Sequence, residues 1–144
     1  MTRGRFGNTT GRPYVAGHII IPSVNVRGVV SFLLDTGADT TVLMPTDAVR
    51  LGVDFSRLSR TAISYGIGGK SRDYVTPAVF VIADGSTLHA YEIDLRLPKA
   101  RGELSTAPSL LGRDIANRWR IVLDHSTNRF EIEIVSSDLI VPAR

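Results

Sequence analysis

Short runs of apolar and β-branched residues, separated by polar turns, divide the chain into segments of strand length. Glycine, proline, asparagine and aspartate, the residues typical of turns, bound most of these runs. One turn is predicted at Asp84-Gly85, because an Asp-Gly pair between two apolar runs is a strong signal for a two-residue hairpin. The predicted strands cover residues 14–21, 28–34, 61–65, 75–83, 87–97, 119–123 and 129–135, and the short runs at 24–27 and 40–44 could add one or two more.

Helical signals are few. Pro45 suits the first position of a helix and Gly52 its end, and a second short helix is expected over residues 115–118. About eight or nine strands against two short helices predict a mainly β protein. A length of 144 residues suits a single domain. We expect a flexible arm over residues 1–13, a folded domain over 14–135 and a tail over 136–144.

Composition excludes several kinds of chemistry. The chain has no cysteine, which excludes disulfides and zinc–thiolate sites, and its three histidines, at 18, 89 and 125, lack metal-ligand spacing. The net charge of +3 comes mainly from scattered arginines, so we do not expect nucleic-acid binding. Neither a signal peptide nor a membrane-spanning run is visible, which favours a soluble cytoplasmic protein.

The run Phe32-Leu33-Leu34 ends abruptly at the polar segment Asp35-Thr36-Gly37-Ala38-Asp39. A charged carboxylate at the end of a buried strand is costly unless it is hydrogen-bonded. The threonine hydroxyl can form such a bond, and the glycine lets backbone N–H groups approach the carboxylate. This pattern is typical of a carboxylate held at the floor of a cleft, although an ordinary turn at the end of a strand would also produce it.

Two further segments stand out. Gly66-Ile67-Gly68-Gly69 lies between two predicted strands and would form the tip of a hairpin. Leu110-Leu111-Gly112-Arg113-Asp114 is a second apolar run that ends at glycine. With the Asp35 turn, these segments resemble the active-site turn, the flap tip and the helix-opening segment of the retropepsins, the retroviral-type aspartic proteases. The resemblance covers roughly residues 14–119.

The resemblance implies a closed, barrel-like retropepsin fold with a glycine-rich flap hairpin. It also implies catalytic roles for Asp35, Thr36 and Gly37, and an ion pair between Asp39 and Arg113. The residues that it implies for substrate binding are Ala38, Asp39, Tyr65, Gly66, Ile67 and Gly68. The predicted helix after Pro45 and the complete hairpin after Trp119 look more like cellular or bacterial members of the group than viral ones.

The expected activity is that of an aspartic endopeptidase that needs neither metal nor cofactor. Two carboxylates that share one proton can activate a water molecule. The chain has a single Asp-Thr-Gly, so by the logic of the family a homodimer supplies Asp35 twice. Ala38 cannot donate a side-chain hydrogen bond toward the carboxylate, so we expect a less acidic activity optimum than in pepsin-like enzymes. The main alternative is a catalytically silent module that binds peptides or mediates dimerisation.

Overall fold

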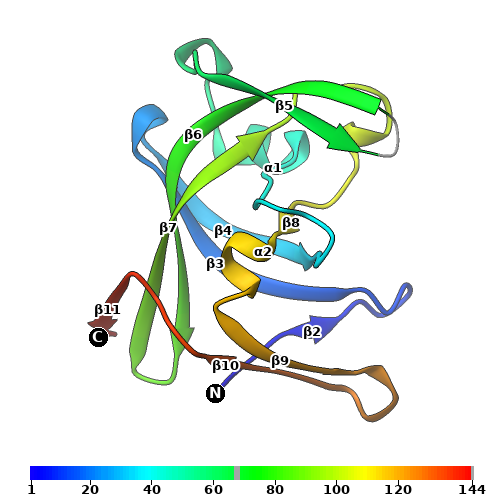
Figure 1. The fold of residues 1–144 in the computed structure, drawn as a ribbon, viewed down its shortest axis with the longest axis vertical. Helices are drawn as coiled ribbons and strands as arrows, with labels where there is room; N and C mark the ends of the chain where they lie inside the picture. Colours follow the sequence, from blue (N-terminus) through cyan, green and yellow to red (C-terminus); the bar gives the residue numbers. More distant parts are fainter. Residues whose placement is uncertain (67–68, 144) are drawn as a thin grey trace.

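The computed structural model describes residues 1–66 and 69–143, and strands dominate it (Figure 1). The strands are β1 (Thr2–Arg3), β2 (Arg5–Phe6), β3 (Pro13–Ile21), β4 (Val26–Leu34), β5 (Thr61–Gly66), β6 (Gly69–Asp84), β7 (Thr87–Leu97), β8 (Leu110–Leu111), β9 (Trp119–Asp124), β10 (Arg129–Ile134) and β11 (Leu139–Pro142). The helices are α1 (Pro45–Leu51) and α2 (Arg113–Ala116), and short 3-10 turns cover Pro22–Val24, Phe55–Arg57, Gly102–Ser105 and His125–Thr127. The predicted mainly β class with two short α-helices is confirmed.

The strands form two sheets. The larger has the order β11-β7-β6-β3-β4-β8, with β2 added beside β3 and β5 beside β6. The smaller has the order β1-β10-β9. Among the described residues the two sheets do not join into a closed barrel, so the predicted closure is only approximate. In the same residues, no helix is long and apolar enough to cross a membrane.

Most neighbouring strands are antiparallel, but the strand that leads to Asp35 has a parallel partner. Leu33 and Leu34 at the end of β4 pair with Leu110 and Leu111 of β8. A parallel pair needs a long connection. Here that connection contains α1, the β5–β6 hairpin and β7, so residues distant in sequence meet at the end of β4.

An aromatic cluster fills the centre of the core. Phe80 packs between Phe32 and Tyr91, with ring centroids 5.7 and 6.2 Å away, and Trp119 lies 6.2 Å from Phe80. The Trp119 indole N–H donates to the Tyr91 hydroxyl at 2.8 Å, which satisfies the polar end of a buried ring. Burial raises the pKa of Tyr91, so its phenol stays protonated and can donate to the Ser136 carbonyl at 2.9 Å.

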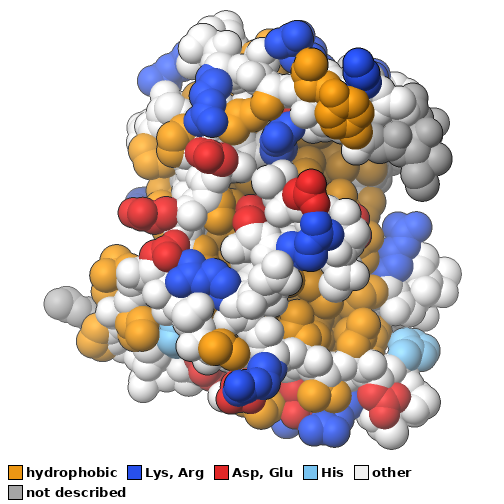
Figure 2. All heavy atoms as spheres, in the orientation of Figure 1, with side chains coloured by type: hydrophobic (Ala, Val, Ile, Leu, Met, Phe, Trp, Pro, Cys, Tyr) orange, Lys and Arg blue, Asp and Glu red, His pale blue; other side chains and the backbone are white. Residues whose placement is uncertain are grey.

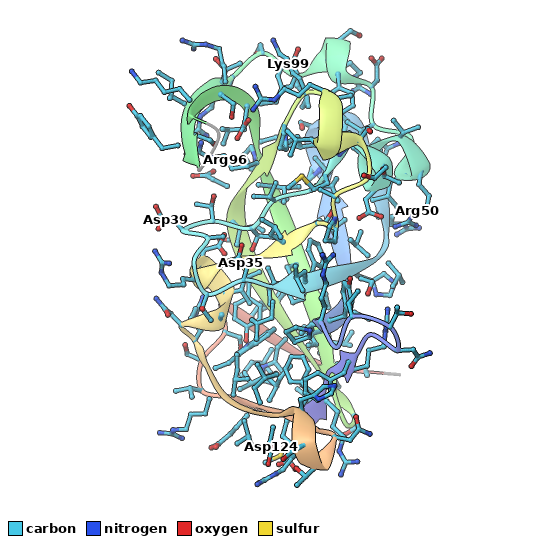
Figure 3. The ribbon with its side chains drawn as sticks, turned by 90° about the vertical axis from the view of Figure 1, so that its right-hand side faces the viewer. Asp35, Asp39, Arg50, Arg96, Lys99 and Asp124 are labelled. Carbon is cyan, nitrogen blue, oxygen red and sulfur yellow. The ribbon has the colours of Figure 1, made fainter. Side chains whose placement is uncertain are left out.

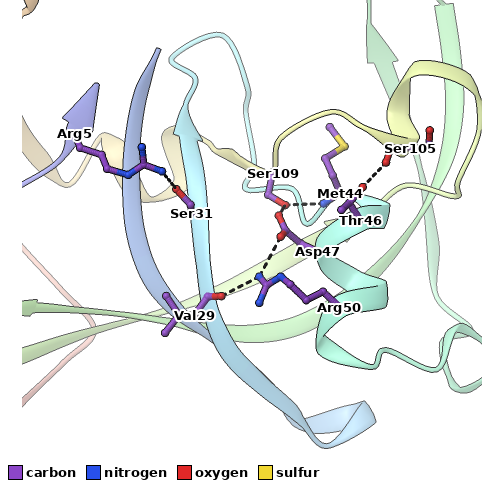
Figure 4. A network of polar contacts seen from close by, with 9 residues as sticks. All are labelled: Arg5, Val29, Ser31, Met44, Thr46, Asp47, Arg50, Ser105 and Ser109. Carbon is purple, nitrogen blue, oxygen red and sulfur yellow. Dashed lines mark hydrogen bonds and ion pairs between the residues drawn. The ribbon is translucent and has the colours of Figure 1, made fainter. Parts of the chain in front are cut away.

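Helix α1 is attached to the sheet by a polar network (Figure 4). Ser109 donates to the Asp47 carboxylate at 2.7 Å and accepts from the Met44 N–H at 2.9 Å. Arg50 donates to Asp47 at 3.1 Å and to the Val29 carbonyl at 2.9 Å. The network therefore holds together the start of α1, strand β4 and the segment that leads into β8.

Both chain ends contain short strands that the sequence did not predict. Thr2 and Arg3 pair with β10, and Arg5 and Phe6 pair with β3. Near the other end, β11 pairs with β7. These end segments are polar, glycine-rich or short, so they have no periodic pattern of apolar residues. They are ordered by pairing with the edges of distant strands.

Three predicted boundaries are shifted. Helix α2 begins at Arg113, two residues before its predicted start, because Gly112 adopts the extended conformation of a helix N-cap. Asp84 pairs with Thr87, so the two-residue turn is Gly85-Ser86. Strand β6 begins at Gly69 because it also forms the second limb of the β5–β6 hairpin.

Candidate active site

Asp35 follows directly after β4 and is held there by backbone hydrogen bonds. Its N–H donates to the Leu111 carbonyl at 3.0 Å, which continues the parallel pairing with β8. The chain then turns, because the Ala38 N–H donates to the Asp35 carbonyl at 3.2 Å. The position of the carboxylate is thus set by the main chain of two strands.

The turn itself supplies a donor to the carboxylate. The Gly37 N–H donates to Asp35 Oδ1 at 2.9 Å. A Cβ at position 37 would lie 3.2 Å from the same oxygen, so glycine gives the carboxylate room. Asp35 is half-buried, whereas Thr36 and Gly37 are exposed. The predicted turn therefore presents one hydrogen-bonded carboxylate near a surface.

Arg113 braces the turn from the other side. Its N–H donates to the Ala38 carbonyl at 2.9 Å, and its guanidinium donates to the Thr36 carbonyl at 2.6 Å. The guanidinium also pairs with Asp39, whose side chain is 85% exposed. The structure brings the predicted pair together, and the two backbone bonds make Arg113 a support for the turn as well as a surface ion-pair partner.

A buried threonine and an aspartate, both missed from the sequence, complete this support. The Thr41 backbone N–H and hydroxyl donate to the two oxygens of Asp114, at 2.9 and 2.8 Å. The Thr41 hydroxyl also accepts from the Gly112 N–H at 3.2 Å. Thr41 is fully buried. Two signals for these residues were available in the sequence. Thr41 is a polar residue directly before the apolar run that begins at Val42, and Asp114 is an acidic residue in the first turn of a short helix.

The flap consists of β5 and β6, and both limbs are present. Tyr65 pairs with Lys70, whose ammonium lies 5.7 Å from the centre of the Tyr65 ring. Tyr65 is 75% exposed, a position that does not favour contact between its ring and a substrate near Asp35. Gly66 ends β5. Ile67 and Gly68 lie outside the described residues.

Arg96 of β7 was not predicted as a site residue. It lies on the same side of the molecule as Asp35 and Asp39 (Figure 3). Its backbone N–H donates to the Thr41 carbonyl at 3.2 Å, and its carbonyl accepts from the Leu43 N–H at 2.8 Å. Its side chain donates to the Ile63 carbonyl of the flap at 3.2 Å. Arg96 therefore connects the flap with the segment that follows the Asp35 turn.

This arrangement agrees with the comparison with protein families. The family model described as "Aspartyl protease" matches residues 22–115, a span that contains the Asp35 turn, the flap and the start of α2. The chain belongs to this aspartyl protease family. A comparison with curated protein sequences gave no match.

Solved structures of two proteases have a similar fold. The aspartyl protease chain is similar to a retropepsin-like aspartic protease from Rickettsia conorii, with a TM-score of 0.58 and 22% identity over 84% of this chain and 83% of that one. It is also similar to the EIAV protease complexed with the inhibitor HBY-793, with a TM-score of 0.51 and 24% identity over 77% of this chain and 90% of that one. The predicted identity as a retropepsin-like aspartic protease and the predicted fold are confirmed.

The predicted site residues around Asp35 lie close together in the structure. The structure brings Asp35, Thr36, Gly37, Ala38, Asp39 and Arg113 into one hydrogen-bonded group. Their roles in catalysis and substrate binding stay predictions, as do those of Tyr65 and Gly66. The described residues hold no group of three or more histidine and acidic side chains suited to a metal ion.

Proposed function

We propose that this protein is an aspartic endopeptidase that acts as a homodimer, with one Asp35 from each protomer in the catalytic pair. The observation that carries the proposal is the Asp35 turn. Its single carboxylate is fixed by main-chain hydrogen bonds, is half-buried, and lies beside an exposed threonine and glycine. A second copy across a two-fold axis would complete the pair and cover these exposed residues.

The proposed reaction uses the two carboxylates with one shared proton. Like charges close together cannot both ionise easily, so one group is protonated and the other is charged. The charged carboxylate takes a proton from water as the water oxygen attacks the peptide carbonyl carbon. The protonated carboxyl donates to the carbonyl oxygen. The C–N bond of the resulting tetrahedral species then breaks as the amine nitrogen is protonated, and the two groups act as one titrating unit.

Within this scheme the residues around Asp35 position it. The Gly37 N–H orients the carboxylate through its bond to Oδ1. Arg113 holds the Thr36 and Ala38 carbonyls, which fixes the turn while leaving the Thr36 hydroxyl at the surface. In the proposed dimer that hydroxyl would contact the partner's turn.

The test compares cleavage of a peptide library by the wild-type protein and by Asp35→Asn. The substitution keeps the size of the side chain but removes its acid–base chemistry, so we expect kcat/KM to fall by about a thousandfold or more. Asp124→Asn is the matched control, because Asp124 lies at the other end of the molecule (Figure 3) and should leave the rate unchanged. Analytical ultracentrifugation at several protein concentrations measures the fraction of the protein that is dimeric.

Three outcomes would contradict the proposal. One is a folded wild-type dimer that cuts nothing between about pH 3 and 8. If that dimer still binds a statine-type inhibitor, it is the silent peptide-binding module instead. The second is equal activity in the wild-type protein and Asp35→Asn, and the third is full activity of a monomer. A rate that peaks below about pH 3 would contradict the less acidic optimum expected from Ala38.

A further inference from the structure

The register of the flap hairpin divides it into two faces of different character. Residues opposite each other in an antiparallel pair point to the same side, and successive residues alternate. One face carries the pairs Ser64–Ser71 and Ala62–Asp73, and the other carries Ile63–Arg72 and Tyr65–Lys70.

Exposure identifies which face is turned inward. Asp73 is only 4% exposed, and Ser64 and Ser71 are half-buried. On the other face, Ile63 and Tyr65 are 44% and 75% exposed. Figure 2 shows hydrophobic side chains on the outer surface at this end of the molecule. Apart from Ala62, the inner face of the flap is therefore polar, and the large apolar side chains of Ile63 and Tyr65 point outward.

Arg96 continues the inner face toward Asp35. It pairs with Val75 of β6, two residues beyond Asp73 and thus on the same face. Its guanidinium NH1 donates to the Ser64 hydroxyl at 2.8 Å. On its other edge, Arg96 forms a bridge with Val42, in the segment that follows the Asp35 turn. The guanidinium thus lies between the flap and that segment.

Asp73 and Arg96 are the two charged residues on this inner face, and they are not equally available to a ligand. Both Asp73 oxygens accept from serine hydroxyls, Oδ2 from Ser64 and Oδ1 from Ser71 at 3.3 Å, and the carboxylate is buried. Arg96 is half-buried and uses one guanidinium nitrogen, NH1, for both of its bonds. Within residues 1–66 and 69–143, Nε and NH2 have no hydrogen-bond partner. A guanidinium with free donors is suited to bind a carboxylate.

We propose that Arg96 determines specificity, by selecting a substrate with an aspartate or glutamate side chain close to the scissile bond. The inference rests on the proposed endopeptidase function. The acidic side chain would lie between the inner face of the flap and the Val42 segment. There it would accept hydrogen bonds from the free guanidinium donors, while Asp73 and Ser64 hold the guanidinium in place.

The test measures kcat/KM for pairs of peptides that differ only by glutamate or glutamine at one position, at about pH 6, where free glutamate is ionised. For the wild-type protein we expect glutamate to be favoured by about tenfold or more at one position near the cut, the usual effect of a charge-assisted hydrogen bond. In Arg96→Gln, which keeps a donor for Ser64 but lacks the charge, the ratio should fall close to one. Any general damage to the flap affects both peptides and cancels in the ratio.

Arg72→Gln is the matched control. It also removes one guanidinium charge, from the flap hairpin that Arg96 contacts, but Arg72 is on the outer face, where it donates to Thr61 at 3.1 Å. Its glutamate-to-glutamine ratio should equal that of the wild-type protein. A wild-type protein that cuts without preferring glutamate at any position would overturn the inference, as would a preference that survives in Arg96→Gln. A wild-type protein that cuts neither peptide contradicts the proposed function instead.

Discussion

The Asp35 turn and the flap lie on the same side of the molecule, but they are held in different ways. The turn is fixed by backbone bonds to Leu111 and Arg113 of one distant segment, and the segment that follows the turn is bonded to the backbone of Arg96. Among the described residues, the outer part of the flap, 61–66 and 69–73, pairs only with itself, and the side chain of Arg96 connects it to the rest of the site. The difference implies that damage to the turn costs global stability, whereas damage to the flap changes recognition and local order.

The largest expected effect on stability is that of Gly112→Ala, because Gly112 lies against the backbone of Thr40 and Thr41 beneath the turn. A Cβ there would lie 2.5 Å from the carbonyl carbon and oxygen of Thr40 and 2.9 Å from the Thr41 N–H nitrogen. These are backbone atoms that cannot move alone, so we expect the free energy of unfolding to fall by about 3 kcal/mol. Urea denaturation followed by tryptophan fluorescence measures this change.

Gly28→Ala is the matched control for that clash. A Cβ at position 28 would also be too close to a neighbour, at 2.4 Å, but the neighbour is the flexible end of Leu51. That side chain can rotate, so the loss should stay below about 1 kcal/mol. Equal losses in the two variants would show that backbone crowding at Gly112 does not set the stability of the turn.

A smaller and more local effect is expected for Asp73→Ala in the flap. The change removes the acceptor of the Ser64 and Ser71 hydroxyls. Both serines are half-buried and can bond to water instead, so we expect a loss of about 1 kcal/mol or less in global stability. Amide hydrogen exchange should accelerate in β5 and stay unchanged in β4 and β8. Faster exchange in β4 would contradict the separation of the two regions.

The smallest effect concerns Asp138, which lies outside the site, just before β11, and accepts a hydrogen bond from β7. The bond from Arg118 lowers the pKa of Asp138 below its ordinary value of 3.8, and the Glu92 N–H adds to this. A lowered folded-state pKa stabilises the protein above the unfolded value, and the stabilisation is lost as the pH falls through the folded pKa. Asp138→Asn should therefore be less stable than the wild-type protein at pH 7, by less than about 1 kcal/mol because the pair is partly exposed. The difference should shrink as the pH falls below 3.8 toward the lowered folded pKa, and thermal unfolding across that range measures it.

Local chemistry was enough to predict the elements whose signals lie within their own segments. Strand β7 has the predicted bounds because apolar and polar residues alternate from Tyr91 to Leu97 and turn residues lie on both sides of the strand. Helix α1 has the predicted start at Pro45, and Gly52 follows its last residue as predicted. The Asp35 turn was recognisable because a carboxylate, a hydroxyl and a glycine follow one another at the end of an apolar run. Each of these features needs only neighbours in sequence.

Features that depend on distant partners could not be predicted in this way. The strand at Thr2–Arg3 exists because β10 has a free edge. The pairing of Thr41 with Asp114 joins residues 73 positions apart, and the local signal at each residue does not show which partner it has. The polar inner face of the flap was not predicted, because which face is turned inward depends on the register of β5 with β6 and on contact with Arg96 of β7.

The parallel pairing of β4 with β8 also sets the order in which the protein can mature. Contacts between segments so far apart form late, since the entropy of closing the intervening chain must be overcome first. During synthesis, the segment with Asp35 leaves the ribosome long before the segment with Arg113 and Asp114 that fixes it. A nascent chain therefore contains the Asp-Thr-Gly sequence without the structure that orients it. If the protein is the proposed endopeptidase, we expect proteolytic competence to appear only once translation has passed α2.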